Sequence, residues 1–157
     1  MKEVLLEALR LKALPRTGWV RAGIENPESV AAHSWGVAWL CCVLCPEHLD
    51  KQRVLEIAIL HDLAEVRVGD LTPDDPVSPE DKHAMESAAF NDMTEQLCHR
   101  DHLRAVWHEK SPEADFVKQM DRLDMALQAQ EYGGLQEFID SALEVIEEPF
   151  HRDLACS

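Results

Sequence analysis

Hydrophobic residues recur at three- and four-residue steps along most of this chain, which is the spacing of amphipathic α-helices. No segment alternates apolar and polar residues over the length of a strand. The 36 Leu and Ala residues also outnumber the 20 Val, Ile and Thr residues, the β-branched types that favour strands. The pattern therefore predicts an all-α protein.

Local signals set the ends of the expected helices. Ser29 and Ser78 have the character of N-cap residues, and Gly133-Gly134 closes a long helical pattern. The segment 15–28 carries two glycines and two prolines, so we expect a loop there. The expected helices cover residues 2–14, 29–45, about 50–65, 78–97, 103–107, 112–132 and 135–147.

Length and composition are those of one globular domain. The chain has 157 residues, of which 46% are hydrophobic and 29% charged. Domains commonly contain about 100–200 residues, so a single domain over residues 1–157 is expected. The longest uninterrupted apolar stretch, Gly36 to Cys45, falls well short of the roughly 18 residues that a membrane span needs.

The chain is strongly acidic, with thirty Asp and Glu against fifteen Lys and Arg and a formal net charge of −15. This balance argues against nucleic acid and against anionic membranes as partners, because both are bound through Lys and Arg. An anionic small substrate would need a local cation, either a metal ion or a few placed arginines.

Five cysteines indicate a reducing compartment. Cys41, Cys42 and Cys45 lie within one and a half turns of one expected helix, where they suit a reduced core better than a disulfide framework. A zinc site built from these thiolates is the alternative, although no fourth ligand stands at finger or ribbon spacing. We therefore expect a cytoplasmic protein.

Polar residues interrupt otherwise apolar helix faces at His33, His61-Asp62 and Asp121. Divalent ions such as Mn, Fe, Co and Ni accept mixed imidazole and carboxylate ligands. Burying an ionised carboxylate without a cation costs several kcal/mol, so the two aspartates need a positive partner. That partner is a metal ion, a nearby base such as Arg122 or Lys118, or the N–H groups at a helix start, and His33 alone would also suit an ordinary core position.

The order of these residues resembles that of the HD-domain metal-dependent phosphohydrolases, and within them the 5′-deoxynucleotidase subfamily of HDDC2-like and YfbR-like proteins. The resemblance runs from about Arg16 to Tyr132. The motifs that carry it are Arg16-Thr17-Gly18-Trp19, Pro27-Glu28-Ser29-Val30, His33-Ser34, His61-Asp62-Leu63-Ala64-Glu65, Gly69-Asp70 and Lys118-Gln119-Met120-Asp121. It implies a compact all-helical HD-domain fold, frequent homodimers, and hydrolysis of deoxynucleoside 5′-monophosphates with one divalent metal ion, whether Mn, Co, Ni, Fe or Mg.

The resemblance also implies a role for each site residue. The implied metal ligands are His33, His61, Asp62 and Asp121. Glu65 is then the base that orders the attacking water, and Asp70 acts near the sugar or the leaving oxygen. For both acids an ordinary ion pair or a solvated turn is the alternative.

The implied substrate-binding residues are Arg16, Trp19 and Arg21. Trp19 would lie against the deoxyribose, although plain core packing explains it equally well. In the YfbR-like branch an arginine directly precedes the tryptophan, whereas Gly18 stands there in this chain and Arg16 comes two residues earlier. Either Arg16 or Arg21 is therefore the candidate for the phosphate.

Four further possibilities remain open. The same metal centre could act on another phosphorylated small molecule, such as a nucleoside triphosphate or a phosphodiester. The chain could be a regulatory HD module without turnover. His83 or His108 could serve a second metal, although exposed histidines are the better expectation, and residues 135–146 could offer a pairing surface for a second chain.

Overall fold

The computed structural model describes residues 1–156. Over these residues the protein has ten α-helices and one 3-10 helix, and its one extended pairing is a bridge between Pro15 and Ser29. The all-α prediction is confirmed. The chain forms two compact units, one from residues 1–32 with 59–109 and the other from residue 33 to 58 with 110 to the end of the described chain.

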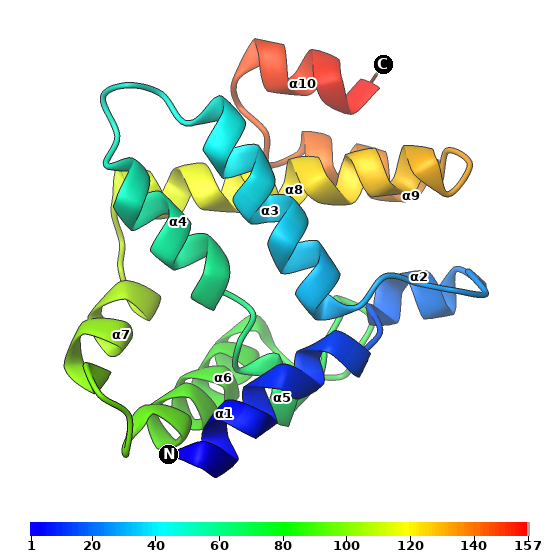
Figure 1. Ribbon diagram of the computed structural model, residues 1–157. Helices are drawn as coiled ribbons and strands as arrows, with labels where there is room; N and C mark the ends of the chain where they lie inside the picture. Colours follow the sequence, from blue (N-terminus) through cyan, green and yellow to red (C-terminus); the bar gives the residue numbers. More distant parts are fainter. Residues whose placement is uncertain (157) are drawn as a thin grey trace. The chain divides into compact units, whose positions relative to one another are not determined.

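The first unit contains the short helix that begins at Glu65, the last residue of the His61-Asp62-Leu63-Ala64-Glu65 motif. In this unit α5 (Glu65–Val68) contacts η1 (Leu9–Ala13) and α6 (Pro79–Thr94), and α6 contacts α7 (Arg100–Trp107) (Figure 1). Its buried core includes Trp19, Phe90, Met93 and Val106. Its elements are α1 (Lys2–Ala8), η1 (Leu9–Ala13), α2 (Thr17–Arg21), α5 (Glu65–Val68), α6 (Pro79–Thr94) and α7 (Arg100–Trp107).

The second unit is organised on α8 (Pro112–Glu131), the longest helix of the described residues. Helices α9 (Gln136–Leu143) and α10 (Pro149–Cys156) both contact α8 and each other (Figure 1). The turn from α8 to α9 passes through Gly133 and Gly134, whose φ angles of 105° and 80° favour glycine. The helices that lie wholly or mostly in this unit are α3 (Val30–Leu44), α4 (Lys51–Leu60), α8 (Pro112–Glu131), α9 (Gln136–Leu143) and α10 (Pro149–Cys156).

Side-chain caps fix the helix starts that the sequence indicated. The backbone N–H of Ala32 donates to Ser29 Oγ at 3.1 Å, and that of Asp81 donates to Ser78 Oγ at 3.1 Å. Such a cap satisfies one of the N–H groups that a helix leaves open at its first turn. The expected starts at residues 29 and 78 are thus within one residue of α3 and α6.

The helix expected over about 50–65 is wrong in its last turn. Helix α4 ends at Leu60, residues 61–64 form turns, and α5 begins at Glu65. The backbone N–H of Glu65 donates to Asp62 O at 3.0 Å, a three-residue step that tightens the chain there. His61 and Asp62 therefore lie in a turn rather than on a helix face.

The C-terminal helix expected over 135–147 is also wrong, because α9 ends at Leu143 and a separate helix, α10, follows. Arg152 closes this junction by donating from Nη1 to Leu143 O at 2.5 Å and to Ile146 O at 2.7 Å. Ile139, Ala142 and Ile146 are buried. These apolar side chains are therefore not available as a surface for a second chain.

Two smaller differences concern the N-terminal part. The helix expected over 2–14 is divided into α1 and η1, and the expected loop 15–28 contains the short helix α2.

None of the helices within residues 1–156 combines the length and the hydrophobicity that a membrane span requires.

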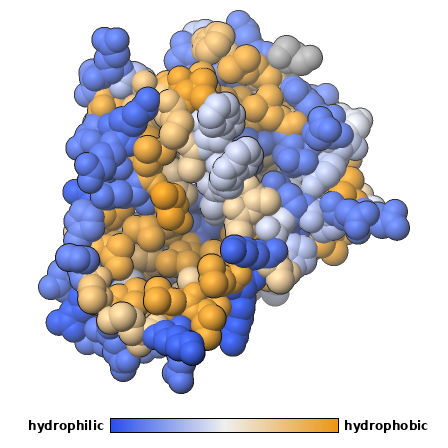
Figure 2. All heavy atoms as spheres, viewed as in Figure 1, coloured by the Kyte–Doolittle hydropathy of each residue, from blue (hydrophilic) through white to orange (hydrophobic). Residues whose placement is uncertain are grey.

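Some large hydrophobic side chains lie at the surface. Trp35, Trp39 and Val43 recur every fourth residue along α3 and are 71%, 56% and 57% exposed. Figure 2 shows apolar side chains, in orange, among polar ones, in blue, on the face in view.

Candidate metal centre and active site

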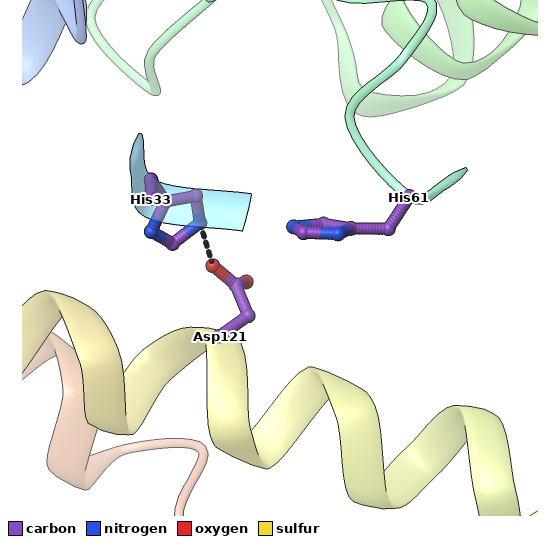
Figure 3. Close-up of side chains that lie close together, drawn as sticks. All are labelled: His33, His61 and Asp121. Atoms are coloured by element: carbon purple, nitrogen blue, oxygen red, sulfur yellow. Dashed lines mark ion pairs between the residues drawn. The ribbon is translucent and has the colours of Figure 1, made fainter. Parts of the chain in front are cut away.

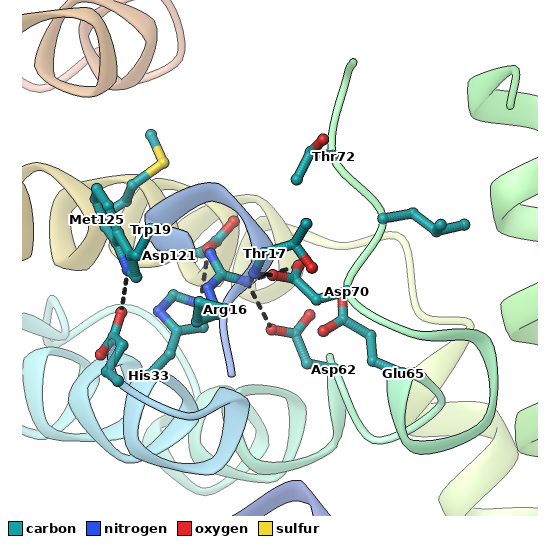
Figure 4. Close-up of polar contacts among 12 residues, drawn as sticks. Arg16, Thr17, Trp19, His33, Asp62, Glu65, Asp70, Thr72, Asp121 and Met125 are labelled. Carbon is teal, nitrogen blue, oxygen red and sulfur yellow. Dashed lines mark hydrogen bonds and ion pairs between the residues drawn. The ribbon is translucent and has the colours of Figure 1, made fainter. Parts of the chain in front are cut away.

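In the first unit, Asp70 ties together two segments that lie far apart in the sequence. Its Oδ2 accepts the backbone N–H of Thr17 at 2.5 Å, and its Oδ1 lies 3.4 Å from Arg16 Nη1 (Figure 4). Gly69 precedes it with a φ of 87°, a conformation that favours glycine and that turns the chain out of α5. Asp70 is 9% exposed. It is therefore a buried, bonded carboxylate and not a solvated turn acid.

Arg16 also faces the aspartate of the His-Asp dipeptide. Its Nη1 lies 3.7 Å from Asp62 Oδ2 (Figure 4). The side chains of Arg16 and Asp62 are each only 16% exposed. One guanidinium thus lies between the carboxylates of Asp62 and Asp70 and offsets part of their mutual repulsion.

Glu65 is the most deeply buried acid of this unit, at 3% exposed. Burial, followed by the negative charges of Asp62 and Asp70, raises the pKa of the Glu65 carboxyl to about 9, while Arg16 and Lys82 oppose the shift. Lys82 Nζ lies 3.8 Å from its Oε1. Its Oε2 has no hydrogen-bond partner among the described residues. A buried carboxyl that holds a proton near neutral pH has the properties of a general acid or base.

His61 and Asp62 present two donor atoms side by side. His61 Nε2 lies 3.2 Å from Asp62 Oδ2, and both side chains are largely buried. The indole N–H of Trp107 donates to the backbone oxygen of His61 at 3.3 Å, which helps to hold the turn in place.

In the second unit, His33 on α3 lies between two aspartates of α8. Its Nε2 lies 3.0 Å from Asp121 Oδ1 (Figure 3), and its Nδ1 lies 2.7 Å from Asp124 Oδ2. His33 is fully buried, whereas the side chain of Asp121 is 25% exposed. Asp121 Oδ2 also lies 4.0 Å from Arg122 Nε, the base that the sequence offered as its alternative partner.

These residues fit the demands of a divalent ion. Ligand atoms about 2.1 Å from an ion and at right angles to each other lie about 3.0 Å apart. The two nitrogen–oxygen distances, 3.0 Å for His33 with Asp121 and 3.2 Å for His61 with Asp62, match that spacing. Within each unit, one imidazole and one carboxylate thus lie at the spacing of neighbouring ligands of an octahedral ion.

The structure separates the two candidate arginines. Arg16 lies with Asp62 and Asp70, whereas Arg21 lies over the 72–75 turn, donating to Thr72 Oγ1 and, at 2.6 Å, to Asp75 Oδ1. The Arg21 side chain is 40% exposed. Arg16 is therefore the arginine that lies beside the two candidate site acids, Asp62 and Asp70.

Trp19 on α2 is 2% exposed, and its indole N–H donates to Glu28 Oε1 at 2.9 Å (Figure 4). Burial of the ring and this hydrogen bond anchor α2 within its unit. His83 and His108, the candidates for a second metal, are exposed and flank Trp107, with His83 stacked on it at 5.7 Å between ring centroids.

Sequence reasoning missed two residues that contact the candidate site. Lys82 lies beside Glu65, and Asp124 lies beside His33. Asp124 stands three residues after Asp121, so both fall on one face of α8. That spacing was the signal that could have identified it.

The fold and these paired donors define the class of the protein. Residues 8–151 match the family model described as HD domain. The chain belongs to the HD-domain family.

Curated relatives share much of the sequence. The 5′-deoxynucleotidase HDDC2 of Bos taurus is 42% identical over 154 residues, covering 87% of this chain and 75% of the relative. The 5′-deoxynucleotidase hdd1 of Schizosaccharomyces pombe is 41% identical over 133 residues, covering 78% and 67%. Among solved structures, the PH0347 protein from Pyrococcus horikoshii OT3 has a TM-score of 0.80 and 32% identity, covering 99% of this chain and 96% of that one.

Proposed function

We propose that this protein is a metal-dependent 5′-deoxynucleotidase, which hydrolyses deoxynucleoside 5′-monophosphates to deoxynucleoside and phosphate. The observation that carries this function is the pairing of imidazole and carboxylate donors at ligand spacing, with the buried Glu65 close to one pair, in an HD-domain chain. The identity to curated 5′-deoxynucleotidases over most of the chain supports the same activity.

His33, His61, Asp62 and Asp121 are the proposed ligands of one divalent ion. A bound ion of this kind polarises a phosphoryl oxygen and lowers the pKa of a water, which makes hydrolysis feasible near neutral pH. The imidazole and carboxylate mixture suits Mn, Fe, Co, Ni or Mg rather than a thiolate-bound metal.

Glu65 and Asp70 are the proposed catalytic acids. Glu65 accepts a proton from the attacking water and orders that water for in-line attack on phosphorus. A neighbouring cation favours the ionised form of a carboxylate. Binding of the metal ion would therefore lower the raised pKa of Glu65 and prepare this residue to act as a base. Asp70 orients Arg16 and the start of α2, and it faces the sugar or the leaving oxygen.

Arg16 is the proposed phosphate-binding residue, with Trp19 against the sugar and Arg21 in a supporting position. A guanidinium offers a planar fork of N–H donors that a lysine does not have. Losing such charge-assisted bonds costs about 1.5–3 kcal/mol. We therefore expect Arg16→Lys to raise the KM for a nucleotide about 10- to 100-fold, while Arg21→Lys changes it little. The reverse order in steady-state kinetics would assign the phosphate to Arg21.

The deciding experiment measures phosphate release from deoxynucleoside and ribonucleoside monophosphates, with Mn, Co, Ni, Mg and Zn added separately. Release from the deoxy series with a clear preference over the ribo series is expected. Release only from triphosphates or phosphodiesters would favour the wider HD phosphohydrolase interpretation. No release from any nucleotide by metal-loaded protein would favour a regulatory module.

We also propose that residues 1–157 function as one HD domain, because the family match draws on residues of both units. The five free cysteines favour a cytoplasmic location. The small-molecule nucleotide is the proposed partner, and the net charge of −15 disfavours nucleic acid.

A homodimer is proposed from the exposed face of α3 formed by Trp35, Trp39 and Val43. An aromatic side chain can bury about 150–250 Å², and a stable interface buries about 800 Å² per partner. Two tryptophans could therefore supply a large part of a self-complementary contact. Light scattering would measure the mass in solution, and a single-chain mass at every concentration and salt level would contradict the dimer.

A further inference from the structure

The second ring nitrogen of His33 has a partner that no predicted role accounts for. His33 is fully buried on α3, and its Nδ1 lies 2.7 Å from Asp124 Oδ2. A neutral imidazole carries one hydrogen, and an ionised carboxylate can only accept. With the hydrogen on Nδ1 and donated to Asp124, the lone pair of Nε2 is available on the side of the ring that faces Asp121 Oδ1 at 3.0 Å.

Asp121 and Asp124 of α8 thus contact opposite nitrogens of the His33 ring. They stand three residues apart on one helix face, which places their carboxylates next to each other. Asp121 shares the ligand side of the ring, and Asp124 holds the opposite side. Ligating histidines commonly donate their other ring N–H to a carboxylate, which fixes the ring and its tautomer.

Gly36 makes the approach of Asp124 to His33 sterically feasible. It lies three residues after His33 on α3, and a Cβ at this position would stand 2.9 Å from Asp124 Cγ and closer still to Oδ1. Glycine weakens the middle of a helix relative to alanine. Its φ is not positive, so backbone geometry does not demand glycine here. Space for the Asp124 carboxylate is the feature that does.

We propose that Asp124 is a positioning residue of the metal centre, which holds His33 in the Nδ1–H tautomer with Nε2 directed at the ion, and that Gly36 admits it. This inference rests on the proposed function in one respect, the role of His33 as a metal ligand. Every contact that carries it lies within the second unit.

The first test titrates Mn²⁺ into metal-free protein by calorimetry. Asp124→Ala is expected to weaken binding about 10- to 100-fold, the usual effect of removing the partner of a ligating histidine. Asp124→Asn should recover part of this loss, because the amide oxygen still accepts the Nδ1–H. Asp115→Asn removes the same charge from an exposed position of α8 and should leave the affinity within about twofold.

The second test follows the tautomer directly by nitrogen-15 NMR of the His33 ring in metal-free protein, at a pH high enough that the ring carries a single hydrogen. We expect the Nδ1–H form in the wild type and in Asp124→Asn, and a shift toward Nε2–H in Asp124→Ala. A purely structural role for Asp124 would lower stability without changing the tautomer, so an unchanged ring spectrum in Asp124→Ala overturns the proposal.

The third test is a cycle with Gly36→Ala. Alone, this change should weaken Mn²⁺ binding, because the methyl group displaces Asp124. In the Asp124→Ala background it should have little further effect, since the displaced carboxylate is already gone. Independent, multiplicative losses from the two changes would overturn the role given to Gly36.

These outcomes separate this inference from the proposed function. A wild-type protein that binds no Mn²⁺ and releases no phosphate contradicts the proposed function. A wild type that does both, with Asp124→Ala, Asp124→Asn and Gly36→Ala all retaining full affinity, contradicts only the inference. Should Asp124→Ala fail to fold, the Mn²⁺ affinity and the ring spectrum of Gly36→Ala, which displaces the same carboxylate, still decide it.

Discussion

Replacing His61 with alanine should abolish both metal retention and phosphate release. His61 Nε2 lies 3.2 Å from Asp62 Oδ2, so the change removes one member of a donor pair and leaves the carboxylate without its neighbour. The charge stabilisation that an ion gives a reacting phosphoryl group amounts to several kcal/mol, so activity should fall about 10³-fold or more. Elemental analysis after dialysis and phosphate release at saturating nucleotide measure the two effects.

His48→Ala is the matched control for this prediction, because His48 is exposed and lies outside the predicted site. It should retain metal content and rate within about twofold of the wild type. If His61→Ala held one equivalent of metal and turned over normally, the proposed centre would be wrong and its acids would be ordinary ion-pair partners.

Replacing Glu65 with glutamine should lower turnover about 10²- to 10⁴-fold, the usual contribution of a general base, while metal content stays unchanged. Glutamine keeps the shape of the side chain but cannot take a proton from water. The ratio of rates at saturating substrate isolates this step from binding.

Glu65→Gln should also change how the free energy of unfolding depends on pH. The pKa of Glu65 is raised by burial from an ordinary value of 4.5 to about 9 in the folded protein. Its carboxyl therefore binds a proton more tightly in the folded state, and the stability linked to it is full below pH 4.5 and is lost as the pH rises toward 9. Glutamine has no such proton, so metal-free Glu65→Gln should gain stability relative to the wild type across this range.

Urea unfolding of metal-free protein at several values between pH 5 and pH 9 measures this difference. Glu80→Gln, at an exposed position of α6, is the matched control and should follow the wild-type pH dependence. A Glu65→Gln curve parallel to that of the wild type would mean that Glu65 is ionised in the folded protein and would remove the argument from its burial.

The periodicity of the chain was sufficient to predict an all-α fold. The starts of α3 and α6 were predictable from Ser29 and Ser78, because a side-chain cap acts over only three residues. It could not predict where α4 ends. The apolar spacing continues through His61 to Glu65, and only the three-residue turns at 61–64 show that the helix stops. At the break after Leu143, Arg152 of the following helix donates to that carbonyl, a contact that the local pattern does not predict.

The order of the residues allowed candidates for the site to be proposed, but it did not predict their contact partners. No local sequence feature distinguishes Asp70 from a solvated acid. Only the structure shows that its carboxylate accepts the backbone N–H of Thr17. Likewise, Arg16 and Arg21 look equivalent in the sequence, and only the structure places one beside Asp62 and Asp70 and the other over Asp75. Long-range contacts of this kind are not encoded in local spacing.

The bond from the Thr17 amide to Asp70 has a consequence for engineering. One carboxylate is a proposed catalytic group, and it also holds the start of α2 to the segment after Gly69. Any redesign of specificity that exchanges Asp70 for a neutral side chain must supply a new acceptor for that amide. Without one, Arg16 and the start of α2, the helix that carries Trp19, would become less firmly held.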